Sequence, residues 1–317
     1  MEPPGRGDLD VSRLASVLPE WQTYEMTADA QVAERIGTAT VAISNKVRID
    51  DAAMRNALHL RLICIAATGT NHVDLEAARR RGIAVCNVPG YATASVVQHV
   101  FALILALSTR LPEYQQALRA GRWQQSGQFC VLDYPIREIA GKTLGIIGYG
   151  ALGQAVARVA EAFGMKVMVA QSRHGCQAAP AVAGQVVRVP LRELLSQVDI
   201  LSLHCPLTPE TRGLIGAAEL ALMRPDALLI NTARGGIVDE QALALALCQG
   251  KLGGAGVDVL TQEPPVQGNP LLAGDVPRLI VTPHIAWASR EARQRLVDEI
   301  TANIEAFLQG NIRHRVA

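Results

Sequence analysis

The chain has 317 residues, of which 49% are hydrophobic and 19% are charged, and its formal net charge at pH 7 is +1. This composition indicates a globular protein, and the length predicts two domains rather than one. The near-neutral charge, with no basic run longer than Arg79–Arg81, argues against nucleic acid as a partner.

The sequence predicts neither membrane insertion nor secretion. Its longest apolar run, 100–107, is too short to span a bilayer, and residues 1–10 are polar. The six cysteines are scattered, with neither C-x-x-C nor zinc-site spacing. We therefore expect a cytoplasmic protein with reduced thiols, no bound metal and no membrane partner.

Residues 21–87 alternate strand and helical patterns, which predicts helices packed on a parallel sheet. Strands are expected at 21–26, 40–44, 62–67 and 83–87, with helices at 29–36, 50–58 and 74–81. Thr68 and Gly69 follow one of these strands, at the edge where open α/β sheets bind ligands. A plain strand–helix turn is the alternative explanation of this loop.

A strongly apolar helix is expected at 94–108, and we interpret it as a bridge between two domains. Beyond it, the stretch from Lys142 to Arg173 reads strand, glycine turn, helix and strand. The helix of this stretch is expected to bury one stripe, formed by Leu152, Val156, Val159 and Phe163.

The glycine turn has G-x-G-x-x-G spacing, at Gly148, Gly150 and Gly153. Gly148 permits the tight turn, Gly150 lets the backbone approach a pyrophosphate, and Gly153 lets helix and strand pack closely. The helix then begins with Ala151 and Leu152, and its unpaired N–H groups face the anion. This context predicts a bound dinucleotide.

Three polar residues follow the ends of later strands, which are expected at 186–189, 199–203, 227–231, 255–259 and 279–282. Arg234, Glu263 and His284 follow the last three, and parallel strands bring such residues to one edge of a sheet. A guanidinium there can hold a carboxylate and polarise the neighbouring carbonyl. An imidazole, kept protonated by a carboxylate behind it, can deliver a proton as a nicotinamide delivers hydride. Taken singly, each of the three is more typical of an ordinary loop residue.

The runs GKTLGIIGYGALG, NTARGGIVDE, GVDVLTQEPP and TPHIAWAS resemble those of the D-isomer-specific 2-hydroxy acid dehydrogenases, over nearly the whole chain. The pieces NVPGYATASV, LRAGRWQQSGQFC and HIAWAS are most similar to the branch of glycerate dehydrogenases and hydroxypyruvate reductases. The resemblance implies two Rossmann-like α/β domains, with a cofactor domain at 94–286 inserted in a substrate domain formed by 1–93 and 287–317. It also implies a homodimer that forms through the cofactor domain.

The same resemblance assigns roles to individual residues. Arg234, Glu263 and His284 correspond to the family's catalytic residues, with His284 as proton donor and Glu263 hydrogen-bonded behind it. Thr68 and Gly69 correspond to the backbone loop that anchors the substrate carboxylate together with Arg234. Cofactor contacts are implied at Pro206, Thr211, Thr232, Ala233 and, for the nicotinamide amide, Asp258.

The sequence departs from the NAD-type pattern at the end of the strand that follows the glycine-turn helix. An acid about 20 residues beyond such a turn binds the ribose 2′-OH of NAD. Here Gln171, Ser172 and Arg173 occupy that position, so no carboxylate would repel a 2′-phosphate and Arg173 can pair with one. We hypothesise that the NAD(P) site either uses both cofactors or prefers NADP(H). The alternative is a solvent-facing Arg173 and NAD held without the acid.

A second departure lies at the N-terminus, where the family has an apolar strand in the middle of the substrate-domain sheet. Residues 1–10 include prolines, glycines and charged side chains, so they cannot form it. We expect either a chain that begins late or a rearranged sheet.

The predicted function is reduction of hydroxypyruvate or glyoxylate to D-glycerate or glycolate with NAD(P)H. The alternatives within enzymes are another D-2-hydroxy acid specificity, or formate or phosphite oxidation on this fold. A different class is a corepressor-like protein that senses NAD(H) and recruits partners. Turnover of 2-keto acids separates the enzymes of the first kind from the binding protein.

Overall fold

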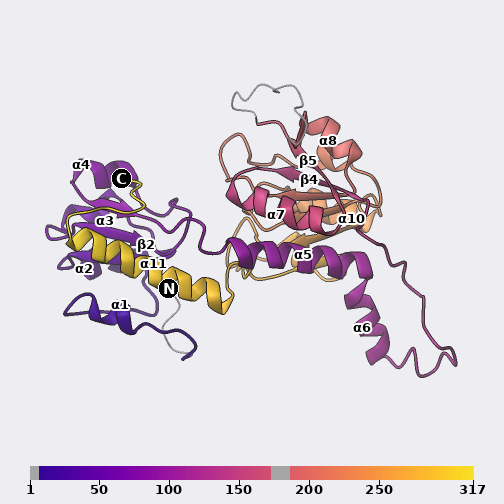
Figure 1. The fold of residues 1–317 in the computed structure, drawn as a ribbon, viewed down its shortest axis with the longest axis horizontal. Coiled ribbons are helices and arrows are strands. Elements are labelled where there is room, and N and C mark those ends of the chain that lie inside the picture. The colour runs from indigo at the N-terminus through magenta and orange to yellow at the C-terminus, as the bar shows by residue number, and fades with distance from the viewer. Residues whose placement is uncertain (1–6, 173–185) are drawn as a thin grey trace. The chain divides into compact units, whose positions relative to one another are not determined.

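In the computed structural model, which describes residues 7–172 and 186–317, the chain forms two compact units. The first unit consists of Met1–Ala92 and Ala288–Ala317, and the second of Thr93–Trp287. The chain therefore passes between the units twice, and the second is an insertion within the first (Figure 1).

The first unit contains a parallel sheet with the strand order β1-β2-β3. The strands are β1 (Val41–Ser44), β2 (Leu62–Ile65) and β3 (Ala84–Cys86). The helices are α1 (Ser12–Ser16), η1 (Asp29–Gln31), α2 (Val32–Ile36), α3 (Asp51–Arg55), α4 (Leu75–Arg80) and α11 (Arg290–Leu308).

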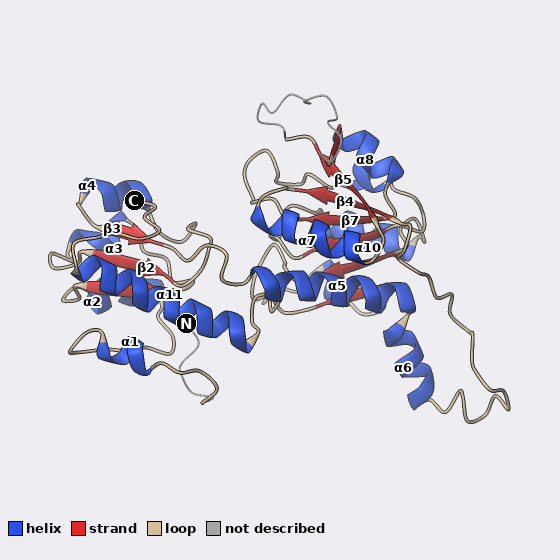
Figure 2. Cartoon of the chain, viewed as in Figure 1, coloured by secondary structure: helices blue, strands red, loops and turns tan. Residues whose placement is uncertain are grey.

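Helices cover both faces of this sheet (Figure 2). As a result β2, whose side chains alternate between the two faces, is buried at every position. Leu62 and Cys64 pack with α1 and α11, whereas Ile63 and Ile65 pack with α2, α3 and α4. The last helix of the chain thus completes the core of the first unit.

The strand predicted at 21–26 is wrong, because these residues lie outside any sheet. Tyr24 and Met26 are exposed, and Arg35 of α2 stacks on the Tyr24 ring and bonds the Met26 carbonyl. The C-terminal segment instead pairs with the edge of β3, where the Val316 N–H donates to the Val85 carbonyl at 2.8 Å.

The second unit contains a seven-stranded parallel sheet in the order β10-β9-β8-β7-β4-β5-β6. Its strands are β4 (Thr143–Ile147), β5 (Lys166–Ala170), β6 (Val187–Val189), β7 (Ile200–Leu203), β8 (Leu228–Asn231), β9 (Gly254–Val257) and β10 (Leu279–Val281). The strand order reverses beside β4, as in a doubly wound sheet. The α/β fold class predicted from the sequence is confirmed.

The helices of the second unit are α5 (Thr93–Thr109), α6 (Leu111–Arg119), α7 (Ala151–Ala162), α8 (Leu191–Gln197), α9 (Ala217–Leu220), α10 (Glu240–Cys248) and η2 (Pro270–Leu272). Helices α5 and α7 contact one another and the sheet, while α8, α9 and α10 contribute to a separate apolar cluster. Helix α5 lies close to β9, since a Cβ on Gly256 would be 2.9 Å from the Leu103 Cβ.

Two kinds of feature are absent from the described residues. No single helix there has the length and apolar character to cross a membrane; α5 and α6 reach both only when taken together, across a bend of 59°. The same residues contain no cluster of three His, Cys, Asp or Glu side chains suited to a metal ion.

Helix α7 buries only part of the predicted stripe, because Val156 alone of the stripe's residues is fully buried. The buried residues are Gly153, Ala155, Val156, Ala157 and Ala160. Val159 is only half-buried, and Phe163 is 40% exposed and stacks on Phe101 of α5. Gly153 explains this face, because a Cβ there would lie 2.2 Å from the Gly148 carbonyl oxygen. The helix packs against the sheet through its smallest side chains, and larger residues are displaced to its flank.

The loop after β7 lies directly against the glycine turn. The His204 N–H donates to the Ile147 carbonyl at 2.7 Å, and a Cβ on Gly148 would lie 2.5 Å from the Cys205 nitrogen. The His204 Nε2 is 2.9 Å from the Ser202 Oγ, while its buried Nδ1 has no hydrogen-bond partner among the described residues. Burial lowers the pKa of His204 to about 4, so the ring is neutral at pH 7.

This lowered pKa predicts a specific acid sensitivity. The unfolded chain, with a His pKa of about 6.5, takes up the proton first, so stability falls as the pH drops from about 6.5 towards 4, by about 3 kcal/mol in total. We expect His204→Gln to lose less stability than the wild type between about pH 7.5 and about pH 5 in urea unfolding. His59→Gln, at an exposed histidine, is the control. Equal losses in wild type and His204→Gln would contradict the assignment.

Candidate active site

Strands β8, β9 and β10 are neighbours in the sheet, and the loops after them carry the three residues predicted to take part in the reaction. Arg234 follows β8, Glu263 follows β9 and His284 follows β10. Because the three strands are parallel, all three loops lie at the same, carboxyl edge of the sheet.

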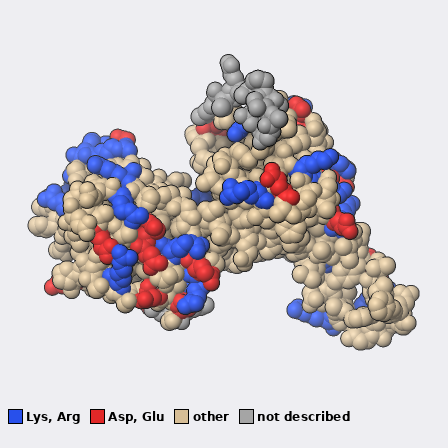
Figure 3. Space-filling view, in the orientation of Figure 1, with Lys and Arg blue, Asp and Glu red and all other residues tan. Residues whose placement is uncertain are grey.

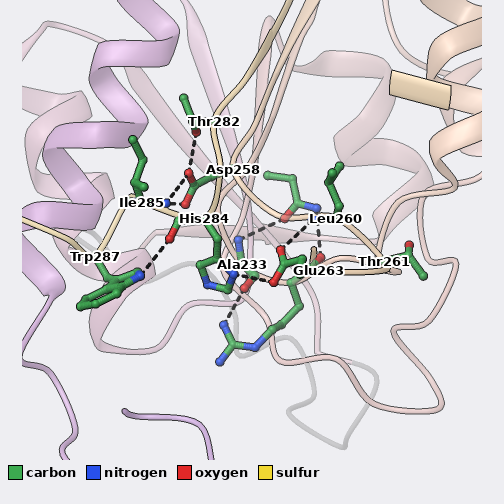
Figure 4. Close-up of polar contacts among 12 residues, drawn as sticks. Ala233, Asp258, Leu260, Thr261, Glu263, Thr282, His284, Ile285 and Trp287 are labelled. Carbon is green, nitrogen blue, oxygen red and sulfur yellow. Dashed lines mark hydrogen bonds and ion pairs between the residues drawn. The ribbon is translucent and has the colours of Figure 1, made fainter. Parts of the chain in front are cut away.

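His284 and Glu263 form a hydrogen-bonded pair, with the His284 Nδ1 2.6 Å from the Glu263 Oε2 (Figure 4). The other carboxylate oxygen, Oε1, accepts the Leu260 N–H at 2.8 Å, so Glu263 is held from two sides. A bond from Nδ1–H to a carboxylate leaves Nε2 as the nitrogen that can exchange a proton with a ligand. Among the described residues Nε2 has no hydrogen-bond partner, and the side chain is 25% exposed.

The backbone of His284 is held in an unusual conformation. Its φ of 55° lies in the left-handed region, which costs a non-glycine residue free energy and persists only when the surroundings impose it. The His284 N–H donates to the Asp258 carbonyl at 2.8 Å, and the Trp287 Nε1 donates to the His284 carbonyl at 2.8 Å (Figure 4). These bonds fix the direction in which the imidazole leaves the chain.

Asp258, directly after β9, holds the same loop through its side chain. The carboxylate is 1% exposed, and it accepts the Ile285 and Ala286 N–H groups at 2.9 Å each. It also accepts the Thr282 hydroxyl at 2.5 Å. Three donors from the β10 loop therefore stabilise one buried charge.

The loop of Arg234 is shaped by Asn231, the last residue of β8. The Asn231 Oδ1 accepts the Ala233 N–H at 3.1 Å, and its Nδ2 donates to the Arg234 carbonyl at 3.0 Å. The Arg234 guanidinium, on a partly exposed side chain, donates to the Ala233 carbonyl at 2.7 Å. A Cβ on the next residue, Gly235, would lie 2.0 Å from the Leu260 carbonyl oxygen. The Arg234 loop is thereby pressed against the loop after β9.

The glycine turn offers the space and the donors that a pyrophosphate needs. A Cβ on Gly150 would meet no atom within 4 Å, in contrast to one on Gly148 or Gly153. Gly150 is the N-cap of α7 and provides no capping side chain, so the first N–H groups of the helix, at Ala151 and Leu152, are available to an anion.

The other predicted cofactor contacts lie on loops at the same edge. The Thr232 Oγ1 is buried without a hydrogen-bond partner in the described part of the chain, which leaves a polar atom that a ligand can satisfy. Ala233 beside it is buried. In the loop after β7, the Thr211 Oγ1 donates to the Pro206 carbonyl at 2.7 Å. Together with the open turn at Gly150, these residues fit a dinucleotide.

The residues that bear on cofactor choice follow β5. The Gln171 N–H donates to the Val189 carbonyl at 2.8 Å, and the side chain is partly exposed. Ser172 is exposed. Arg173, on which the NADP(H) hypothesis depends, lies outside the described residues.

Thr68 and Gly69 belong to the first unit, in the loop after β2. The Thr68 hydroxyl donates to the Val88 carbonyl at 2.9 Å, and the Asn87 side chain donates to the Thr68 carbonyl at 2.7 Å. Within the described chain, the backbone N–H groups of Thr68 and Gly69 have no hydrogen-bond partner. The loop is fixed by its other polar groups, and these two donors remain available.

Two polar residues of α5 that contact the β10 loop were not found from the sequence. The Ser95 Oγ donates to the Ala286 carbonyl at 2.7 Å, and the His99 Nε2 is 3.0 Å from the Thr282 Oγ1. The available signal was their i, i+4 spacing, which places them on one face of a largely apolar helix.

Comparison with known proteins supports the fold and shows the family. Residues 101–286 match the family model described as D-isomer specific 2-hydroxyacid dehydrogenase, NAD binding domain. The chain is 48% identical to a glycerate dehydrogenase of Methylorubrum extorquens, with 92% of this chain and 90% of the relative covered. It is 40% identical to a hydroxypyruvate reductase of Blautia hydrogenotrophica, over 96% of this chain and 94% of the relative.

Two solved structures have the same fold. The TT0316 protein from Thermus thermophilus superposes with a TM-score of 0.84 at 38% identity, covering 94% of this chain and 92% of that one. An acyclic imino acid reductase in complex with NADPH and D-Arg has a TM-score of 0.79 at 31% identity, covering 93% and 91%. With the family match and these identities, the chain belongs to the D-isomer-specific 2-hydroxyacid dehydrogenase family.

Proposed function

We propose that this protein reduces a 2-keto acid, hydroxypyruvate or glyoxylate, to the 2-hydroxy acid, D-glycerate or glycolate. The observation that carries the proposal is the pairing of His284 with Glu263 at the carboxyl edge of a doubly wound sheet. The similarity to a glycerate dehydrogenase and a hydroxypyruvate reductase supports these substrates.

The proposed roles follow from the chemistry of each group. The Arg234 guanidinium binds the substrate carboxylate and polarises the neighbouring carbonyl, and we assign the unpartnered N–H groups of Thr68 and Gly69 to the same carboxylate. When bound, the nicotinamide supplies the hydride. His284 gives the Nε2 proton to the forming alkoxide, and Glu263 stabilises the imidazolium through Nδ1.

We propose the second unit as the cofactor domain and the first as the substrate domain. Gly148, Gly150 and Gly153, with the N–H groups of Ala151 and Leu152, would hold the pyrophosphate. Contacts with the rest of the dinucleotide are assigned to Pro206, Thr211, Thr232, Ala233 and Asp258. A carboxylate has about four acceptor sites, so Asp258 keeps capacity for the nicotinamide amide beside its three loop donors.

We further propose that NADP(H) is preferred over NAD(H). Gln171 and Ser172 supply no negative charge after β5, where NAD-type proteins carry an acid. Arg173 is the residue proposed to pair with the 2′-phosphate, on the sequence alone. The related reductase that contains NADPH supports this choice.

His284→Ala removes the proposed proton donor. We expect kcat for hydroxypyruvate or glyoxylate to fall by a factor of about 10² or more, because general acid catalysis contributes that much, while KM changes less. Steady-state rates over a 2-keto acid panel measure this, with His59→Ala, at an exposed histidine, as control. Unchanged turnover removes His284 from the mechanism. A wild type that turns over no keto acid leaves a dinucleotide-binding protein of the corepressor kind.

Gln171→Asp places a carboxylate where it repels a 2′-phosphate and can bind a 2′-OH. We expect the ratio of kcat/KM for NADPH to that for NADH to fall about fivefold or more, since like charges at close range cost about 1 kcal/mol or more. Gln171→Asn, which stays neutral, is the matched control. A wild type that strongly prefers NADH, or an unaltered ratio in the Asp variant, would sink the NADP(H) proposal.

We also propose a homodimer formed through the cofactor domain. Helix α6 and the loop after it project from the body of the second unit and carry exposed apolar side chains (Figure 1). Phe129 is 94% and Leu132 77% exposed. Two parts of this projection are tied together, because the Arg122 guanidinium donates two hydrogen bonds to the Asp133 carboxylate, at 2.7 and 3.2 Å. Exposed apolar groups on a projecting arm support the proposal that this arm contacts a second copy of the chain.

The double variant Phe129→Asp/Leu132→Asp tests this arm. Burying two charges in an apolar interface is unfavourable, so we expect the wild type to be dimeric and the variant monomeric in sedimentation equilibrium. Val266→Asp, also at an exposed apolar position but away from the arm, is the control. A dimeric double variant or a monomeric wild type would contradict the proposal.

We propose a cytoplasmic location and a small-molecule substrate as the partner. The cysteines at 64, 86, 130, 205 and 248 are all free thiols, as in a reducing compartment. Basic and acidic side chains are interspersed on the face shown in Figure 3, rather than gathered into a basic stripe of the kind that binds nucleic acid.

A further inference from the structure

Helix α5 contacts the loop of His284 at two points, one before and one after His284 in the sequence. The Ser95 Oγ donates to the carbonyl of Ala286, two residues after His284, at 2.7 Å. The His99 Nε2 lies 3.0 Å from the hydroxyl of Thr282, two residues before it. Since Ser95 and His99 are four residues apart, one face of the helix makes both contacts.

Hydrogen-bond accounting fixes the proton on His99. The Thr282 hydroxyl has one hydrogen, and its oxygen lies 2.5 Å from Oδ1 of the Asp258 carboxylate, which can only accept. The hydroxyl must therefore accept from His99, so the His99 Nε2 carries hydrogen. The same nitrogen is 3.6 Å from the Asp258 Oδ1, so the partial positive charge of the His99 N–H group lies close to the buried carboxylate.

The Asp258 carboxylate connects these contacts to the reacting residue. At 1% exposure it depends on its donors, and two of them are the N–H groups of Ile285 and Ala286, immediately after His284. Its orientation thus sets the backbone that holds His284 in the left-handed region. Loss of the His99 donor would therefore loosen Thr282 and the Asp258 carboxylate, and through them the loop of His284.

We propose that His99 is a positioning residue for the proton donor. Through Thr282 and Asp258 it fixes the loop on which His284 sits, and so keeps the imidazole aligned with Glu263. The inference rests on the proposed role of His284 where it concerns turnover, but the positioning itself is a property of the loop. The competing explanation is a histidine that merely fills the core, with its side chain 18% exposed.

The kinetic test compares two replacements of His99. Leu keeps the volume and removes the donor, whereas Gln places an N–H group near the position of Nε2. We expect His99→Leu to lower kcat about tenfold, with the keto-acid KM changed less than about twofold, and His99→Gln to recover most of kcat. Thr282→Val should give a similar loss, and the double variant should lose little more than either single variant. Thr109→Val, at an exposed hydroxyl on the far end of α5, should keep the wild-type kcat.

A spectroscopic test does not need turnover. Trp287 donates to the His284 carbonyl, so in a Trp21→Phe/Trp123→Phe background its fluorescence reports on the loop alone. We expect acrylamide to quench Trp287 about twofold more efficiently in His99→Leu, and Gln to restore the wild-type value. Melting temperatures identify any variant that does not fold, in which case Thr282→Val and His99→Gln decide.

The outcomes separate the two proposals. If folded His99→Leu keeps the wild-type kcat and the wild-type quenching of Trp287, the positioning role is overturned. This holds even if the variant melts at a lower temperature. If the wild type reduces no keto acid, the proposed function fails. If His284→Ala stays active, the proposed role of His284 fails. The quenching of Trp287 then still confirms or overturns the link from His99 to the loop.

Discussion

The buried carboxylate of Asp258 is the interaction on which the arrangement of the site depends. A charge at 1% exposure is tolerated only where donors surround it, and here the donors come from the loop that carries His284. Because the carboxylate is desolvated, the loss of any one donor would leave it poorly stabilised. This keeps the loop of His284 in place although the loop has no regular secondary structure. The loop is held in this way as a fixed support for His284.

Close packing of the backbone complements this electrostatic restraint. Gly148, Gly153 and Gly235 each bring main-chain atoms of two loops or elements to distances that no side chain would permit. The carboxyl ends of β4, β7, β8 and β9 are therefore locked to one another without long side chains between them. Open space remains beside Gly150, where a ligand would bind, whereas the backbone is closely packed at Gly148, Gly153 and Gly235.

Much of this fold was predictable, because the strands of the second unit are short apolar runs and such runs are buried on both faces of a parallel sheet. Placing Arg234, Glu263 and His284 at one edge needed only the order of those strands. The roles of these residues in the reaction stay predictions. The errors have a common cause, since periodicity does not report tertiary contacts. The segment at 21–26 found no partner strand, and α7 turned its small residues inward because Gly153 had to touch the glycine turn.

The contribution of Ser95 and His99 was hidden for the same reason, because their partners are almost 200 residues away in the sequence. The left-handed backbone of His284 has its own consequence for how the position can vary. Asparagine tolerates that conformation far better than alanine or a β-branched residue does. Asn is thus the replacement that separates the chemistry of the imidazole from the shape of the loop. A family member that had lost the reaction but kept the fold would be expected to carry Asn or Gly here rather than Val or Ile.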